Sequence, residues 1–205
     1  TFKGSLSPLQ ASRAMELGVR QVLPQAETIL APVADGGDGT MEAILYAQKG
    51  ETHQTTVSGP LGNPVQASWA MLEDGVTAVI EMAVASGLAL LKSDQLDPLR
   101  ASTYGVGELV KAALDKRRHR IVIGLGGSAT VDGGAGMAQA LGVSFLDRKG
   151  RPLPKGGGAL SALAKIDVSG LDSRIRECQI IGACDVSNPL LGLQGAAAVY
   201  GPQKG

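Results

Sequence analysis

The apolar residues near the start of the chain follow a helical spacing on either side of one short extended run. Ser7-Pro8 is a typical helix start, and small or apolar residues then recur on one helical face until Pro24. The apolar run 27–33 predicts a strand, which its proline brings to an end. A glycine-rich loop then leads into a second predicted helix over 41–48.

The pattern then changes to an alternation of apolar and polar residues, which is typical of half-buried strands. Strands are predicted over 52–57, 65–72 and 76–82, and the turns between them are rich in glycine, proline and acidic residues. Three such strands in succession predict an antiparallel meander. We therefore expect a change of domain near residues 58–64.

Helices and strands alternate through the rest of the chain. A short helix is expected over 83–91, and a longer one, capped by Ser102 or Thr103, is expected to run to about Asp115. Later strands are predicted over 143–146 and 177–183. Such alternation is typical of α/β proteins.

The stretch 120–142 carries the strongest functional signal. Its apolar, β-branched run 121–123 predicts a buried strand, which leads into glycines, the hydroxyls of Ser128 and Thr130, and a helix from Met137. Glycines allow backbone N–H groups to approach an oxyanion closely, and a helix N-terminus adds unpaired donors. This layout predicts an anion site, although a tight turn without a ligand has the same pattern.

Acidic residues follow strands in three glycine-containing loops. Asp132 would by itself repel a phosphate, so its position indicates a bound cation or a base that takes a proton from a hydroxyl. Asp35 and Asp38 lie in a second such loop, and Asp185 lies in a third. Because ligands of open α/β sheets gather at the carboxyl ends of the strands, the set indicates magnesium and phosphate chemistry. Each acid alone could equally be an ordinary turn residue.

Charge and composition exclude several classes of function. Lys+Arg and Asp+Glu both number 19, which leaves no excess of positive charge for nucleic-acid binding. The two cysteines are too few for a disulfide scaffold and lack the spacing of a metal site, so a reduced, cytoplasmic protein is expected. No apolar run reaches membrane-spanning length. Two isolated lysines, Lys3 and Lys204, could each neutralise a phosphate or a carboxylate, or could be solvated.

Dinucleotide binding is a rival interpretation of the central loop. The motif GxGxxA over 124–129 follows a strand, and Asp147 ends the next strand about 20 residues later, as the relaxed fingerprint requires. The glycines within 133–136 weaken this interpretation, because a helix should already run there and each glycine costs it roughly 1 kcal/mol. An NAD-dependent oxidoreductase stays open as an alternative, and the phosphate loop GxxxxGK[ST] is absent from the sequence.

Several motifs, taken in order, resemble those of the bacterial glycerate kinases, a family distinct from the P-loop kinases. They are FKGSLS at 2–7, ADGGDGT at 34–40, GLGGSATVDGGAGM at 124–137, CDVSNPLLG at 184–192 and GPQKG at 201–205. The resemblance covers nearly the whole chain. It departs at Asp38, where the family usually has Glu, a change that keeps the charge and shortens its reach.

The resemblance implies an α/β fold of two α/β domains, in which a second, mixed α/β domain is inserted into a flavodoxin-like one. Residues 1–58 would be the first part of the flavodoxin-like domain, and residues 59–205 would be the inserted domain with the glycine-rich loop. Family members begin before FKGSL and continue beyond GPQKG. The flavodoxin-like domain and the C-terminal end of the insert are therefore expected to be incomplete here, and an inactive fragment is a further alternative.

The reaction implied by the resemblance is phosphorylation of D-glycerate by ATP with Mg²⁺, with 2-phosphoglycerate favoured as the product. Such a reaction depends mainly on positioning and charge neutralisation. The implied partners are glycerate and a nucleotide, with no nucleic acid and no membrane, and a homodimer is compatible with the resemblance.

The resemblance also implies roles for individual residues. Lys3, Asp35, Asp38 and Asp132 would be catalytic, with Asp35 or Asp38 taking the proton of the attacking hydroxyl. Lys3 and Ser5 would bind glycerate, and Asp132 and Asp185 would hold the metal. ATP would be bound by Gly126, Gly127, Ser128, Thr130 and Lys204.

Overall fold

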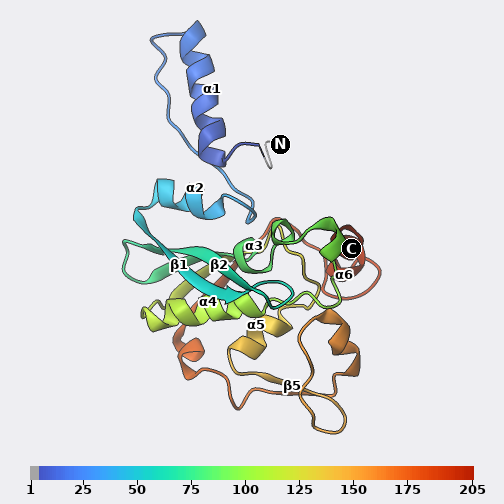
Figure 1. Ribbon diagram of the computed structural model, residues 1–205. Coiled ribbons are helices and arrows are strands. Elements are labelled where there is room, and N and C mark those ends of the chain that lie inside the picture. The colour runs from blue at the N-terminus through green and yellow to red at the C-terminus, as the bar shows by residue number, and fades with distance from the viewer. Residues whose placement is uncertain (1–4) are drawn as a thin grey trace.

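A five-stranded mixed sheet forms the centre of the molecule (Figure 1). The computed structural model describes residues 5–205, so Lys3 lies outside the described residues. The strands lie in the order β1-β2-β3-β4-β7. Their bounds are β1 Gly50–Ser58, β2 Pro64–Leu72, β3 Thr77–Glu81, β4 Arg120–Gly124 and β7 Gln179–Ala183.

Strand direction divides this sheet into an antiparallel and a parallel part. β1 pairs with β2, and β2 with β3, in antiparallel fashion, which confirms the predicted meander. β3, β4 and β7 are parallel, and their register aligns Glu81 with Gly124 and Gly124 with Ala183. The carboxyl ends of these strands therefore lie level at one edge of the sheet, and the loops that follow them start side by side.

Helices and a small second sheet surround the main sheet. The α-helices are α1 Pro8–Val22, α2 Thr40–Ala47, α3 Ala83–Ser86, α4 Tyr104–Asp115, α5 Ala135–Ala140 and α6 Ala196–Tyr200. Short 3-10 helices span Leu88–Leu90, Ser93–Gln95, Gly157–Ala162, Ser173–Glu177 and Gly201–Lys204. β5 Ser144–Leu146 pairs with β6 Lys165–Asp167 to form the second sheet. Each helix and strand predicted after residue 40 is present, although 83–91 divides into α3 and a 3-10 turn.

Apolar side chains pack on both faces of the main sheet, because α4 covers one face and α2 the other (Figure 1). On the α4 side, Val106 and Leu109 pack in a cluster with Trp69, Ile80 and Ile121. On the other face, the cluster contains Ala70, Leu72 and Val79, with Met41, Ile44 and Leu45 of α2 packed against it. Neighbouring residues of β3 thus point to opposite faces, as strand geometry requires.

Helix α1 lies beyond α2 and away from the sheet (Figure 1). It starts with the predicted cap, since the Ser7 hydroxyl accepts from the Gln10 N–H and the Ser7 N–H donates to the Gln10 side chain. Of its predicted apolar face only Ala11 is buried, whereas Met15 and Val22 are 59% and 79% exposed.

The strand predicted over 27–33 is wrong. These residues are extended but pair with no strand among residues 5–205, and the side chains of Ile29 and Val33 are 88% and 82% exposed. A strand requires a neighbour to accept and donate its backbone hydrogen bonds, and sequence pattern alone cannot supply one.

The boundary expected at residues 58/59 falls in the turn between β1 and β2. These two strands pair along their whole lengths, from Gly50 opposite Leu72 to Ser58 opposite Pro64. β1 therefore belongs to the same sheet as the strands that follow it. The division into two domains stays a prediction, and this pairing favours a boundary before Gly50 over one at residue 58.

Candidate active site

Three loops meet at the carboxyl edge of β3, β4 and β7. The Gly126 N–H donates to the Gly36 carbonyl at 2.9 Å, and the Leu125 N–H donates to the Ala183 carbonyl at 3.0 Å. A Cβ on Gly126 would lie 2.5 Å from the Cα of Gly37, so only glycine allows the two glycine loops to approach this closely. The structure thus brings together the loops that carry Asp35 and Asp38, Asp132, and Asp185.

The loop over 34–40 presents its two carboxylates outward. Asp35 and Asp38 are both exposed, and the Gly37 N–H donates to Asp35 at 3.0 Å. Asp38 extends toward the other glycine loop, because its Oδ1 lies 3.5 Å from the position that a Cβ on Gly127 would take. Gly127 has a φ of 71°, a left-handed conformation that favours glycine.

Glu81, at the end of β3, is a residue of this edge that the sequence interpretation missed. Its side chain is buried, and Oε1 accepts a hydrogen bond from the Met41 N–H at the start of α2 at 2.7 Å. Burial raises the pKa of Glu81, and the charge of Asp38 adds to that rise. The sequence could have indicated this role, because Glu81 is an acidic residue at the end of the apolar strand 77–81. The other acidic residues gather at the same edge of the sheet.

Asp132 is turned inward and has a complete set of donors. It is 1% exposed, and its carboxylate accepts from the N–H groups of Thr103, Gly134 and Gly136 at 2.8, 3.2 and 3.1 Å. The hydroxyls of Thr103 and Ser102 also donate to it, at 2.9 and 3.4 Å. Thr103 in turn accepts from the Met137 N–H at 2.9 Å. Asp132 therefore ties the start of α4 to the start of α5, an environment that favours a positioning role over the predicted metal ligand or base.

Lys204 reaches back from the end of the chain to the central loop. Its side chain is 7% exposed, and Nζ donates to the Ser128 hydroxyl at 2.8 Å and to the Thr130 carbonyl at 2.7 Å. Burial lowers the pKa of Lys204, and the charge of Asp132 opposes that shift. The structure thus places this predicted lysine within the glycine loop, where its charge and its hydrogen bonds fix the loop between β4 and α5.

Two cavities adjoin the exposed acids. One, of about 610 Å³, has Asp35 and Asp185 in its wall, between α2 and the residues that follow β7. The other, also about 610 Å³, is lined by Asp35, Asp38 and the start of α1, including Ser7. Ser5 is exposed in the turn just before this helix. Cavities of this size fit small-molecule ligands.

The geometry gives no support to dinucleotide binding. Asp147 lies after β5, which belongs to the second sheet and not beside β4. It is bound by Arg151, whose backbone and side-chain hydrogen bonds lower the pKa of Asp147. The helix after the loop begins only at Ala135, because Gly133 and Gly134 both have positive φ. The fingerprint requires an acid on a neighbouring strand and an earlier helix.

The whole chain matches a family of known proteins. The model of the Glycerate kinase family matches residues 1–205. The chain belongs to this family. It is 56% identical over 205 residues to glycerate kinase of Bacillus subtilis and 50% identical to glycerate 2-kinase of Escherichia coli, covering 100% of this chain and 54% of each relative.

A solved structure confirms the α/β fold of this glycerate kinase family member. A crystal structure from Salmonella typhimurium LT2, described as a glycerate kinase 2, superposes with a TM-score of 0.87 at 49% identity. The match covers 100% of this chain and 55% of that one. The chain therefore spans about half the length of the relatives that it matches.

The exposed carboxylates suit a magnesium ion better than the buried one does. Mg²⁺ is usually held by one or two carboxylates together with substrate phosphates and waters. Asp35 and Asp185 share a cavity wall and are exposed, so they fit this role, whereas the oxygens of Asp132 already accept protein hydrogen bonds. Within residues 5–205, no three His, Cys, Asp or Glu side chains form a ready-made metal site.

Every helix within residues 5–205 is too short or too polar to span a bilayer.

Proposed function

We propose that the protein containing this chain transfers a phosphoryl group from ATP to D-glycerate, with 2-phosphoglycerate as the product. Membership of the glycerate kinase family supports the reaction class. The observation that carries the proposal is the contact between the Asp35–Asp38 loop and the central glycine loop, joined through Gly126 and Gly36. Phosphoryl transfer requires an acceptor activated beside a phosphate-binding surface, and these two loops provide both.

The central loop would bind the phosphates of ATP. Gly126 and Gly127 are partly exposed at the edge of the sheet, and the Gly126 N–H is committed to the Gly36 carbonyl. The Ser128 hydroxyl, which accepts from Lys204, retains its own proton to donate to an oxyanion. Thr130 is buried and supports the loop from within. Lys204 would stabilise phosphate charge through the loop that it holds.

The acceptor side would be supplied by the 34–40 loop and the turn before α1. We assign proton transfer from the attacking glycerate hydroxyl to Asp38, because it is exposed and lies against Gly127. Lys3 and Ser5 would bind the glycerate carboxylate, a role that rests on the family resemblance.

Asp35 and Asp185 would hold Mg²⁺, which when bound neutralises charge on the transferred phosphoryl group. Asp132 would orient the central loop without touching the reactants. A cytoplasmic location and a homodimer belong to the same proposal, as does an inserted domain that carries the central loop.

The test is an ADP-release assay with D-glycerate in the full-length protein, followed by NMR of the product. The proposal predicts ADP release that depends on both ATP and D-glycerate, with a phosphorus signal coupled to the proton on C2. Coupling to the C3 protons would contradict the assigned product and leave the reaction class intact. Absence of glycerate-dependent ADP release would contradict the function itself.

A further inference from the structure

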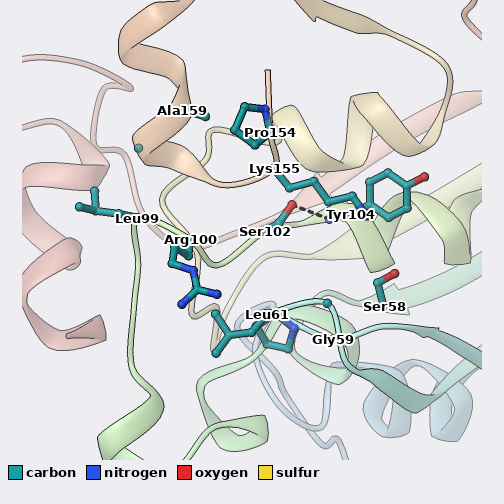
Figure 2. Close-up of a pocket in the computed structure, with 13 residues that line it drawn as sticks. Ser58, Gly59, Leu61, Leu99, Arg100, Ser102, Tyr104, Pro154, Lys155 and Ala159 are labelled. Atoms are coloured by element: carbon teal, nitrogen blue, oxygen red, sulfur yellow. Dashed lines mark hydrogen bonds between the residues drawn. The ribbon is translucent and has the colours of Figure 1, made fainter. Parts of the chain in front are cut away.

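A third cavity lies away from the loops assigned to phosphoryl transfer. It measures about 460 Å³ and is enclosed by the β1–β2 turn, the segment before α4, and the segment that leads into the 3-10 helix Gly157–Ala162. Figure 2 shows side chains from all of these segments around it. None of the residues assigned above to ATP, glycerate or metal lines this cavity.

The walls of the cavity are fixed by the backbone. The Ser102 N–H donates to the Pro60 carbonyl, and the Gly158 N–H donates to the Leu99 carbonyl, both at 2.9 Å. A Cβ on Gly105 would overlap the Ser58 carbonyl, so α4 packs directly on the end of β1. The cavity is therefore formed before any ligand binds, which keeps the entropic cost of binding low.

The charge in the wall is entirely positive. Arg100 and Lys155 are its charged residues, and none of the residues that line it is Asp or Glu. The Lys155 ammonium lies over the Tyr104 ring, 3.2 Å from the centroid (Figure 2). Among the ion pairs of residues 5–205, none includes Lys155. Arg100 approaches Asp97 only loosely, with Nη1 3.8 Å from Oδ2 and its side chain 76% exposed, so it is available to a ligand.

Polar and apolar groups divide the rest of the wall. Pro60, Leu61 and Leu99 offer apolar surface, while the hydroxyl of Ser58 can donate to or accept from a bound group. The Ser102 hydroxyl is committed, since it donates to Asp132 and accepts from the Tyr104 N–H. The Ser58 N–H is already committed to Glu108, at 2.6 Å. A pocket of this kind suits a ligand with one anionic end and a small apolar or ring-shaped body.

We propose that this cavity binds a small organic anion, whose phosphate or carboxylate pairs with Lys155 and Arg100 while its body packs on Leu61 and Leu99. Phosphate and carboxylate share the geometry that Arg recognises with two parallel hydrogen bonds. The site is separate from the proposed kinase reaction. It shares one wall residue with the central loop, because Ser102 also donates to Asp132.

Chemical-shift mapping on the ¹⁵N-labelled protein tests this binding without nucleotide. Phenyl phosphate and benzoate serve as probes with the same apolar body and different anions, and inorganic phosphate serves as the anion alone. We expect saturable shifts at the amides of Gly59, Gly62 and Gly158 with at least one aromatic probe, and weaker binding of inorganic phosphate. The better aromatic probe identifies which anion the pocket prefers.

A double variant with a matched control tests the role of the charges. Arg100→Gln with Lys155→Gln should weaken the better probe at least about tenfold, because charge-assisted hydrogen bonds are lost. Arg148→Gln with Lys149→Gln removes the same charge from exposed residues outside the cavity and should leave affinity within about twofold. Shifts that avoid the cavity amides, or equal affinity in both double variants, would overturn the proposal. Neither result depends on ADP release.

Discussion

The tripeptide Asp-Gly-Gly occurs in two turns of this site, at residues 35–37 and 132–134, and the two turns differ in where the acid points. Locally they are alike: the Gly37 N–H donates to Asp35 at 3.0 Å, and the Gly134 N–H donates to Asp132 at 3.2 Å. Each turn leads into a helix through a left-handed glycine cap. Asp35 is nevertheless exposed, whereas Asp132 is 1% exposed.

The difference comes from residues far away in the sequence. Asp132 meets the start of α4, where Ser102 and Thr103 supply further donors, and it also receives the Gly136 N–H of its own helix. In the other turn, the carboxylate that receives a helix N–H comes from Glu81 of β3. Asp35 keeps only the turn hydrogen bond from Gly37 among the described residues and stays exposed. The same local motif therefore places a buried, fully hydrogen-bonded acid in one turn and an exposed acid, the proposed metal ligand, in the other.

The largest effect expected from this comparison is on stability. Asp132→Ala leaves the N–H groups of Thr103 and Gly136 buried without an acceptor, so the free energy of unfolding should fall by about 3–4 kcal/mol. Asp35→Ala removes one exposed turn hydrogen bond and should cost less than about 1 kcal/mol. Urea denaturation followed by circular dichroism measures both. Equal losses would contradict the distinction between the two turns.

Alanine at the middle glycine of each turn, Gly36 or Gly133, should also lower the free energy of unfolding in the same experiment. The difference between these two variants should be smaller than that between the two aspartate variants. Gly36 and Gly133 both have positive φ, 92° and 57°, so alanine strains either backbone by about 1 kcal/mol. A Cβ on Gly36 would also overlap the Ala183 carbonyl, whereas the nearest atom to one on Gly133 is Leu190 Cδ1 at 3.6 Å. Gly36→Ala should therefore lower the free energy of unfolding by about 3 kcal/mol and Gly133→Ala by about 1 kcal/mol. The reverse order would show that the loops do not pack as described.

The smallest effect expected concerns pH and Glu81. Because burial raises its pKa above the ordinary 4.5, the folded protein binds this proton more tightly than the unfolded chain, and stability falls as pH rises from 4.5 through the folded pKa. Glu81→Gln keeps an acceptor for Met41 and should abolish that part of the pH dependence. At pH 7 it should change stability by no more than about 1 kcal/mol. Glu73→Gln, at an exposed position, is the control and should retain the wild-type profile.

The sequence pattern predicted what depends on neighbours along the chain. The helix start at Ser7, the meander, α4 and the glycine loop after β4 all follow from local spacing and turn chemistry. The proximity of the acid-bearing loops after β4 and β7 could also be anticipated, since parallel strands end at one edge. The position of the 34–40 loop beside them could not, because the run before it is not a strand of the sheet.

What the pattern could not predict depends on partners that are remote in sequence. Burial of Asp132 requires the start of α4, and the role of Glu81 requires α2 to start against β3. The extended run 27–33 has the composition of a strand and no neighbour to pair with among the described residues. An apolar run specifies that a segment can be a strand, and only the assembled sheet decides whether it is one.

Turnover and stability measured together on Asp38→Asn and Asp132→Asn test the central claim most directly. With D-glycerate and ATP in the full-length protein, Asp38→Asn should lower kcat by about 100-fold at an unchanged thermal midpoint, because it removes the proton acceptor. Asp132→Asn should lower the midpoint, and at a temperature where it remains folded its kcat should stay within about tenfold of wild type, because it only positions the loop. An Asp132→Asn variant with the wild-type midpoint and no turnover, beside an active Asp38→Asn variant, would contradict the account.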